Sequence, residues 1–265
     1  NQTDIFTLAL GLKDPWLVTN VEMLPSEKDP MKLEVHITVD WKDGGKFLCP
    51  VCGEENSAYD SDWRTWRHLN LFEHRCYIHA RVPRVKCSNH KVKTVEVPWS
   101  RAGSGFTLLL EAVFLMMLQQ MPVSQVARQV GEHDTRLWRV IEHYVEQALA
   151  LQDFSDVTAI GVDEYSHKGH NYISVFLAHP ERKSSKARVL FVTEGKDKAT
   201  VQRFLETFTA KRGKPDLVEE TSCDMSQGYR NALAEAFPQS LVTVDKFHVV
   251  KRLGDAVDSV RRREM

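Results

Sequence analysis

The stretch "AIGVDEYSHKGHNYISV", residues 159–175, joins two apolar runs through a polar turn and carries two adjacent acids, Asp163 and Glu164, after the first run. The apolar runs and the turn between them predict a β-hairpin. Since Asp163 falls where the apolar run meets the polar turn, we expect the first strand to end there. A core strand that ends on two acids indicates a site that uses carboxylates.

The order of segments after residue 156 predicts the rest of this domain. Apolar runs and helical patterns alternate as β-β-β-α-β-α-β, with a fourth strand in "LVEETSCD" that ends at Asp224. In an RNase H-like mixed sheet of this order, the first and fourth strands are neighbours. We therefore expect Asp163 and Asp224 to meet at one edge of the sheet.

Two carboxylates at such an edge are typical of sites that hold divalent cations for phosphodiester chemistry. We expect Asp163 and Asp224 to be catalytic and to bind Mg²⁺ or Mn²⁺, with one ion for the attacking and one for the leaving oxygen. The alternative is that each Asp caps the turn after its strand, which is a common role of aspartate.

A second constellation lies in two short knuckles, "CPVCG" at 49–53 and "CSNH" at 87–90. Two turns that each present two donors can complete a tetrahedral zinc site, so Cys49, Cys52, Cys87 and His90 are the expected ligands of a structural Zn²⁺. The alternative is a set of reduced, buried cysteines with His90 at the surface. Cys76 lies in an alternating strand pattern and is expected in the core.

Residues 105–151 have helical spacing and predict three helices, of which "PVSQVARQVGEHDTRLWRVIEHYV" (122–145) resembles a helix-turn-helix. Ser124 is the expected N-cap, Gly131 the turn, and Asp134 the approximate start of the second helix. Arg136 and Arg139 are expected to point outward while Trp138, Ile141 and Val145 face inward, or the reverse. The alternative is a plain helix pair. The candidate DNA contacts are Arg128, Arg136, Arg139 and Arg101.

Composition excludes few classes of protein. The chain has 265 residues, 42% hydrophobic and 27% charged, with a formal net charge of −1. No apolar run approaches the roughly 18 to 20 residues that span a bilayer, and the N-terminus lacks a signal-peptide pattern, so we expect a cytoplasmic protein without a membrane role. Residues 81–101 and 246–263 are locally basic, which suits phosphate contacts but also describes a solvated face.

The motifs together resemble the transposases of bacterial insertion sequences of the ISL-three group, within the DDE class. The similar stretches follow in the same order along the chain: "CPVCG", "RTWRHLNLFEHRCYIHARVPRVKCSNH", "VPWSRAGSGFT", "IGVDEYSHKGHNYISVF", "CDMSQGYRNALAEAFP" and "VDKFHVVKRL". The resemblance implies zinc-dependent and helical DNA-binding regions, an RNase H-like catalytic domain, and cleavage and strand transfer at terminal inverted repeats. It also implies a dimer or larger assembly on double-stranded DNA, associated with the nucleoid.

The resemblance assigns roles by position. Asp163 and Asp224 match the first two acids of the triad, whereas Asp245 and His248 match an Asp-x-x-His stretch expected to support the site through hydrogen bonds. The third acid of the family, a Glu after a long helical insertion, has no matching stretch here. Glu264 is a weak substitute, so the chain is expected to be truncated before the third acid and to cleave little DNA alone.

The predicted fold class is a multidomain α+β and α/β protein. Its expected parts are an N-terminal strand region and zinc ribbon (1–100), a helix-turn-helix-like domain (101–152) and an RNase H-like catalytic domain (153–265). Two other functions remain open at this point. One is a non-catalytic, zinc-stabilised DNA-binding protein or fragment derived from a transposase, and the other is a metal-dependent nuclease that cuts without joining.

Overall fold

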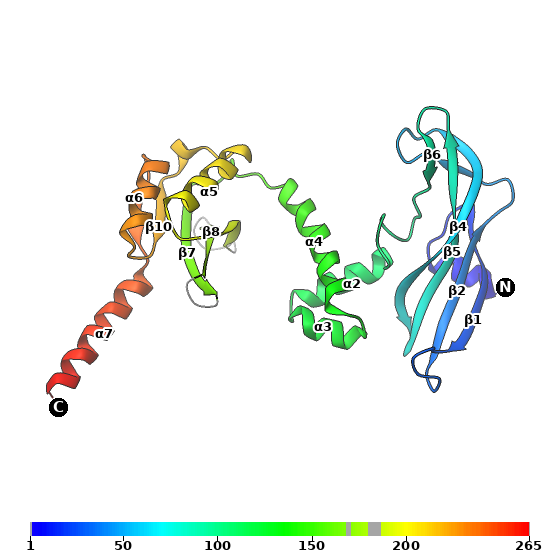
Figure 1. Ribbon diagram of the computed structural model, residues 1–265, viewed down its shortest axis with the longest axis horizontal. Coiled ribbons are helices and arrows are strands. Elements are labelled where there is room, and N and C mark those ends of the chain that lie inside the picture. Colours follow the sequence, from blue (N-terminus) through cyan, green and yellow to red (C-terminus); the bar gives the residue numbers. More distant parts are fainter. Residues whose placement is uncertain (1, 168–170, 180–186, 265) are drawn as a thin grey trace. The chain divides into compact units, whose positions relative to one another are not determined.

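The computed structural model describes residues 2–167, 171–179 and 187–264. It forms two compact units, Asn1–Glu146 and Gln147–Met265, and helix α4 (Asp134–Ala150) runs across the boundary between them (Figure 1). The N-terminal sheet and the helix-turn-helix helices therefore share one unit. The predicted boundary at residue 152 lies near the division between units, whereas residue 100 falls inside the first unit.

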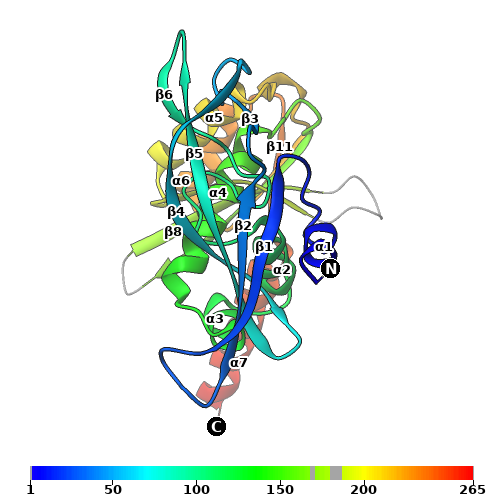
Figure 2. The ribbon, with the colours of Figure 1, turned by 90° about the vertical axis from the view of Figure 1, so that its right-hand side faces the viewer.

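The first unit is built on a twisted sheet of long strands (Figure 2). Its strand order is β1-β2-β5-β4-β3, with β6 paired to β5; β2 and β5 are parallel and the remaining pairs are antiparallel. The bounds are β1 (Trp16–Pro25), β2 (Leu33–Trp41), β3 (Lys46–Leu48), β4 (Glu55–Leu71), β5 (His74–Cys87) and β6 (Lys91–Thr94).

One face of this sheet forms the first core. Val35, Ile37 and Val39 of β2 alternate inward, beside Cys76 and Ile78 of the adjacent β5. Cys76 is 1% exposed, which confirms its predicted place in the core, and burial raises the pKa of its thiol to about 11. Helix α1 (Gln2–Ala9) packs beside β1 (Figure 2), where Thr7 accepts a hydrogen bond from the Val18 N–H.

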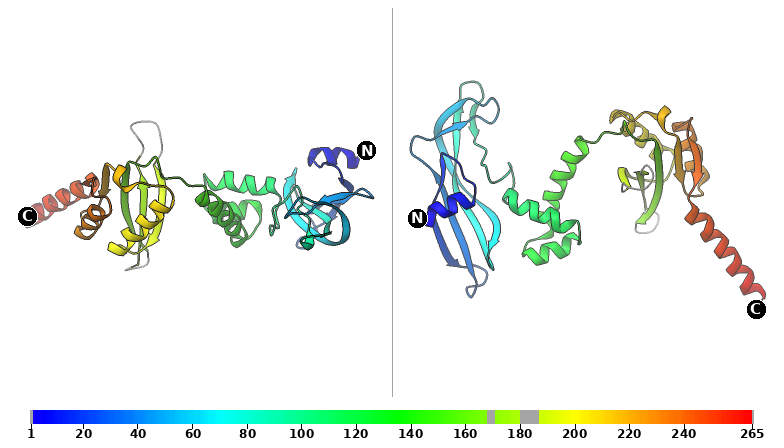
Figure 3. Two further views of the ribbon diagram at one scale, coloured as in Figure 1. Left: turned by 90° about the horizontal axis from the view of Figure 1, so that it is seen from above. Right: turned by 180° about the vertical axis from the view of Figure 1, so that it is seen from behind.

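Three helices follow the sheet, as predicted: α2 (Leu108–Leu118), α3 (Val123–Val130) and α4 (Figure 3). Gly131 ends α3 with φ of +70°, the left-handed conformation that suits the turn of a helix-turn-helix. The predicted N-cap at Ser124 is wrong. The helix starts one residue after Pro122, whose fixed φ of −62° lets it take the N-cap position without a side-chain hydrogen bond.

Helix α4 turns a different face inward from the one predicted. Leu137 and Val140 are buried against α2 and α3, with Tyr144 partly buried beside them, whereas Trp138 is 49% exposed. Trp138 and Arg139 consequently lie on the same exposed side of α4, because adjacent helical positions are only about 100° apart.

The helices are tied to the sheet through Arg67 of β4. Its backbone exchanges hydrogen bonds with Gly105 and Thr107, and its side chain is 4% exposed, with Nε 3.8 Å from a carboxylate oxygen of Glu132. Arg75 of β5 donates to the Gly131 carbonyl at 3.0 Å. These contacts fix the turn of the helix-turn-helix against the end of the sheet.

The second unit contains a five-stranded mixed sheet of the order β11-β10-β7-β8-β9. The strands are β7 (Ala159–His167), β8 (Asn171–Ala178), β9 (Arg188–Glu194), β10 (Glu220–Cys223) and β11 (Leu241–Val244). The element order β-β-β-α-β-α-β and the adjacency of β7 and β10 are as predicted, and the two strands are parallel. This is the RNase H-like arrangement.

Two strand ends differ from the prediction. β7 does not end at Asp163 but continues to His167, since its antiparallel partner β8 pairs with it as far as Asn171. β10 is shorter than "LVEETSCD", because Leu217 ends a short 3-10 helix, η1 (Pro215–Leu217), and Val218 and Glu219 precede the strand, which begins at Glu220. Asp224 directly follows β10, so its predicted position holds.

Helices α5 (Lys198–Ala210) and α6 (Gln227–Ala236) pack on one face of this sheet (Figure 3). Their shared core includes Phe204 and Phe208, with the Phe204 and Phe176 rings stacked at 4.1 Å between centroids. The Tyr229 hydroxyl of α6 is hydrogen-bonded to buried Ser174 of β8, which fixes the start of α6. The last helix, α7 (Lys246–Glu264), has no buried residue among those described.

Glu111 provides a test of how the helices of the first unit are held. Its side chain is fully buried on α2 and accepts hydrogen bonds from Arg101 at 3.0 Å, Ser104 at 2.6 Å and Tyr144 at 2.8 Å. Glu111→Ala leaves the Arg101 guanidinium without its carboxylate and should cost about 3 to 5 kcal/mol of unfolding free energy. Urea unfolding followed by tryptophan fluorescence measures this unit alone, since all six tryptophans lie in it.

The exposed Glu142 of α4 supplies the matched control. Glu142→Ala should change the unfolding free energy by less than about 0.5 kcal/mol. Equal effects of the two substitutions would contradict a specific role of the buried ion pair.

Candidate functional site

Four metal-donor side chains meet at one end of the first sheet. Cys49 and Cys52 come from the turn between β3 and β4, and Cys87 and His90 come from the end of β5 and the turn before β6. Because β4 and β5 form one long hairpin and β3 and β6 pair with its outer edges, the two turns lie together. All four donor atoms lie within 4.8 Å of one another, and no other such group of three or more occurs among the described residues.

The distances between donors fit a tetrahedral zinc ion. Cys52 Sγ is 3.6 Å from Cys87 Sγ, and His90 Nδ1 is 3.4 Å from Cys87 Sγ and 3.9 Å from Cys49 Sγ. A tetrahedron with Zn–S and Zn–N bonds of ordinary length has edges of about 3.5 to 3.8 Å. Three thiolates and one imidazole fill all four positions, so the ion has a structural role.

The thiols in the two halves of this site have different pKa values. Backbone hydrogen bonds from Val51 and Cys52 lower the pKa of Cys49 to about 7. Burial, followed by the hydrogen bond to Glu54, raises the pKa of Cys87 to about 11. Sequence reasoning missed Glu54, which accepts hydrogen bonds from Cys87 Sγ at 3.1 Å and from the Ser88 hydroxyl at 2.9 Å. In the sequence, the only indication of this role is that Glu54 is an acid two residues after Cys52.

In the second unit, three acids lie near one end of three neighbouring parallel strands: Asp163 within β7, Asp224 directly after β10 and Asp245 directly after β11. Ser222 pairs with Gly161, and Cys223 pairs with Val244. Continuing both registers places Asp224 beside Asp163 on one side and beside Asp245 on the other. Neighbouring strands are about 4.8 Å apart, so the three carboxylates share one edge of the sheet.

Each of these carboxylates accepts a hydrogen bond from a nearby backbone N–H. The Oδ1 atom of Asp163 accepts from the Glu164 N–H at 2.8 Å, that of Asp224 from the Ser226 N–H at 2.7 Å, and that of Asp245 from the Phe247 N–H at 2.9 Å. Asp224 therefore caps the turn after β10, as the alternative predicted, whereas Asp163 lies inside β7 and caps no turn. The hydrogen bonds orient the carboxylates, which retain lone pairs that can bind a cation.

Glu164 is a site residue that sequence reasoning left without a role. It shares the inward face of β7 with Ile160 and Val162, as alternation along a strand requires, and it is paired with buried Ser174. Burial raises the pKa of Glu164, and the negative charges of Asp224 and Asp163 raise it further, whereas Lys196 and His248 lower it. An acid at a core-facing position of the strand was the available signal.

His248 and Asp245 are joined, with Nε2 of His248 3.9 Å from Oδ2 of Asp245. The Asp245 N–H donates to the Cys223 carbonyl at 2.8 Å, which holds this segment beside Asp224. Glu264 is at the far end of α7, about 27 Å along the helix from Asp245. That distance is incompatible with a shared ion, so the weak alternative that Glu264 is the third ligand is wrong.

The four arginines predicted to contact DNA have different surroundings. Arg101 is bound to buried Glu111, and Arg136 pairs with Glu132 while its guanidinium lies 4.1 Å from the centre of the Phe106 ring. Arg128 and Arg139 are exposed, and neither makes a side-chain ion pair or hydrogen bond with another residue of the described chain.

Substitution of single cysteines tests which of them bind zinc. Cys49→Ser removes one of four donors and should lower bound zinc well below one ion per chain, together with most of the stabilisation that zinc gives the first unit. Metal content by atomic emission and tryptophan-monitored unfolding measure the two effects. Cys76→Ala is the matched control, since Cys76 is buried away from the cluster and should leave zinc content unchanged. Equal zinc loss in both variants would contradict the ligand assignment.

Comparison with known proteins covers most of the chain. Residues 46–90 match the zinc finger of the transposases of IS204, IS1001, IS1096 and IS1165, and residues 95–145 match the helix-turn-helix domain of transposase family ISL3. Residues 160–265 match the ISL3 transposase domain of the DDE type. The matched segments contain the zinc donors, the helix-turn-helix and the acidic sheet edge, respectively. In the described part of the chain, no helix is both long and apolar enough to cross a membrane.

Individual relatives agree with these family matches. The chain is 29% identical over 225 residues to the transposase for insertion sequence element IS1557 of two Mycobacterium tuberculosis strains, an alignment that covers 81% of this chain and 48% of the relative. It is 25% identical over 253 residues to the transposase for IS1001 of Bordetella parapertussis, covering 93% and 59%. The chain thus spans about half the length of these relatives, and it belongs to the ISL3 family of transposases.

Proposed function

We propose that this chain supplies the DNA-recognition region and most of the catalytic sheet of a DNA transposase, which cleaves DNA at the terminal inverted repeats of an insertion sequence and transfers the ends. The observation that supports the catalytic part is the parallel pairing of β7 with β10 as far as Gly161 and Ser222, which, continued by two residues, would bring Asp163 and Asp224 side by side. Turn caps alone do not require the two acids to occupy matching positions on adjacent strands.

The acidic edge suits divalent cations. Asp163 is exposed and Asp224 is half-buried, so their oxygens are accessible. Burial, followed by the negative charges of Asp224 and Asp163, raises the pKa of Glu164, and a cation at this edge would offset the charges. Mg²⁺ or Mn²⁺, when bound, would activate the attacking oxygen and stabilise the leaving oxygen. Asp163 and Asp224 would hold the ions, and the paired Asp245 and His248 would keep the segment after β11 in place.

DNA recognition is assigned to the first unit. The exposed side of α4, with Arg139 and Trp138, would read base edges in the major groove, and Arg128 of α3 would contact phosphate. Arg101 and Arg136, which are engaged inside the unit, would act by fixing the helices. We propose domains at 1–100, 101–152 and 153–265, a dimer or larger assembly on double-stranded DNA, and a cytoplasmic, nucleoid-associated location.

The acidic edge can be tested by metal binding and by chemistry. Asp163→Asn and Asp224→Asn should each weaken Mn²⁺ binding at least about tenfold, since each removes one of two charged ligands. Because this chain alone is expected to cleave little DNA, Mn²⁺ binding is the main measurement, and any Mg²⁺-dependent nicking that the unaltered chain shows should disappear in each variant. Water-proton relaxation measures Mn²⁺ binding, and nicking of a plasmid carrying the element ends measures cleavage.

Asp216→Asn in η1 is the control for charge, because Asp216 is exposed and lies outside the acidic edge. It should leave metal binding and cleavage unchanged. DNA binding should persist in all three variants. Loss of Mn²⁺ binding together with loss of folding would make the two acids structural, and unchanged Mn²⁺ binding in both site variants would exclude the metal site.

The role of α4 is tested at Arg139. Arg139→Ala should weaken binding to the preferred DNA sequence by about 1 to 3 kcal/mol and relax the base preference at one position. Arg136→Ala should instead lower the stability of the first unit, since Arg136 pairs with Glu132 and stacks on Phe106. Fluorescence anisotropy with preferred and scrambled duplexes, combined with unfolding curves, separates the two arginines.

A further inference from the structure

The tip of the β4–β5 hairpin carries an aromatic side chain that the fold does not use. Leu71 and His74 are paired, so Phe72 and Glu73 form the two-residue turn between the strands. Phe72 is 92% exposed. Burial of a phenylalanine normally contributes to stability, and here nearly the whole ring is left in water.

The backbone at this tip is also unfavourable for phenylalanine. Phe72 has φ of +54°, the left-handed region in which glycine or asparagine is favoured and a bulky residue is an outlier. Such a residue persists where the surrounding structure holds it, and it indicates a function for the side chain. Neither packing nor turn geometry accounts for a phenylalanine at this position.

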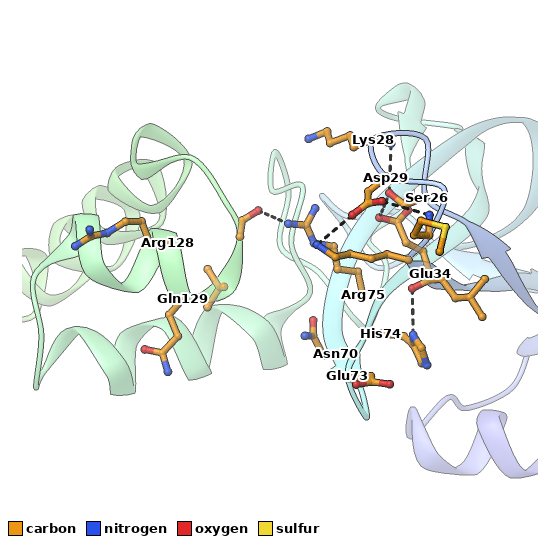
Figure 4. A pocket seen from close by; sticks show the side chains of 15 residues that line it. Ser26, Lys28, Asp29, Glu34, Asn70, Glu73, His74, Arg75, Arg128 and Gln129 are labelled. Carbon is orange, nitrogen blue, oxygen red and sulfur yellow. Dashed lines mark hydrogen bonds and ion pairs between the residues drawn. The ribbon is translucent and has the colours of Figure 1, made fainter.

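The tip lies beside the helix-turn-helix. Arg75, three residues after Phe72, donates to the carbonyl of Gly131 in the turn between α3 and α4. Figure 4 shows Arg75 between the end of the sheet and α3, at the border of a hollow of about 690 Å³. The hollow is lined by the β1–β2 loop, the β4–β5 turn and the end of α3, so the hairpin tip and the DNA-reading helices form one surface.

Two exposed cations that have no carboxylate partner in the described part of the chain border the hollow, which is also lined by Asp29, Glu34 and Glu73. Lys28 of the β1–β2 loop and Arg128 of α3 are exposed, and within the described residues neither side chain makes an ion pair (Figure 4). The negative charge of Asp29 is offset by Lys32, at 3.3 Å. Glu73 is the exposed acid of the turn itself. The β1–β2 loop adds a second exposed apolar side chain, Met31, which is also 92% exposed.

We propose that the β4–β5 tip is a second DNA-contacting element, which inserts Phe72 into the minor groove next to the site read by α4 while Lys28 and Arg128 contact the flanking phosphates. An exposed apolar side chain among cations is the combination by which proteins wedge into the minor groove. This inference rests on the proposed DNA binding of the helix-turn-helix and adds a contact that a helix-turn-helix alone does not make.

The positive φ of Phe72 permits a substitution that should improve the turn and impair the contact. Phe72→Gly and Phe72→Asn both suit the left-handed backbone, so the unfolding midpoint of the first unit should stay the same or rise. Affinity for DNA should fall about tenfold, the size expected for loss of one aromatic contact with bases. The probe is a duplex enriched from a random-sequence pool by the unaltered chain, and fluorescence anisotropy measures the affinity.

The salt dependence of binding distinguishes the groove contact from the phosphate contacts. The Phe72 variants should keep the slope of log affinity against log salt concentration, whereas Lys28→Gln and Arg128→Gln should each reduce it by about one. Hydroxyl-radical footprinting should show loss of protection at sugars beside the main footprint in the Phe72 variants. Leu8→Ala is the control for an exposed apolar side chain: Leu8 is 80% exposed on α1, beside the opposite end of β1.

The outcomes separate this inference from the proposed function. If the unaltered chain enriches no duplex, the proposed DNA binding fails, and the contact of Phe72 fails with it. If the unaltered chain binds DNA and both Phe72 variants bind equally well with the same footprint, only the contact of Phe72 is overturned. Tighter folding combined with weaker binding and a shortened footprint supports it.

Discussion

The parallel pairing of β7, β10 and β11 is the constraint on which the candidate chemistry depends. Strands 61 positions apart in sequence become neighbours because α5 and η1 return the chain to the sheet beside β7. The register is set at Ser222 and Gly161, and its continuation by two residues would put Asp224 beside Asp163. A slip of one residue would turn Asp224 to the other face of the sheet and separate it from Asp163.

Neighbouring carboxylates repel one another, and hydrogen bonds and nearby cations in the second unit reduce this repulsion. Each aspartate accepts a backbone N–H, and Lys196 and His248 act against the raised pKa of Glu164. The pKa of Glu164 is nevertheless raised, first by burial and then by the charges of Asp224 and Asp163. A divalent cation would stabilise the ionised acids. The repulsion between neighbouring carboxylates, which destabilises the folded protein, therefore favours metal binding.

The sequence predicted the order of elements better than their ends. Periodicity and the paired knuckles were sufficient for the β-β-β-α-β-α-β order and for a cluster of Cys49, Cys52, Cys87 and His90. The end of β7 could not be predicted, because it is set by pairing with β8 rather than by polarity at Asp163. The inward face of α4 was also missed, since Leu137 and Trp138 are both apolar and only packing against α2 and α3 selects between them.

Charge at the DNA-reading end could not be judged from composition, because a count of arginines does not show which are already paired. Arg101 and Arg136 neutralise Glu111 and Glu132 inside the first unit, so they add little positive potential outside it. The cations available to DNA are then few, and the net charge of −1 provides no general attraction. A protein with few phosphate contacts must obtain more of its affinity from shape and apolar contacts with bases. Trp138 on α4 and Phe72 at the hairpin tip are exposed aromatic side chains beside the turn of the helix-turn-helix that can supply such contacts, and Tyr59 and Trp63 of β4 are exposed as well.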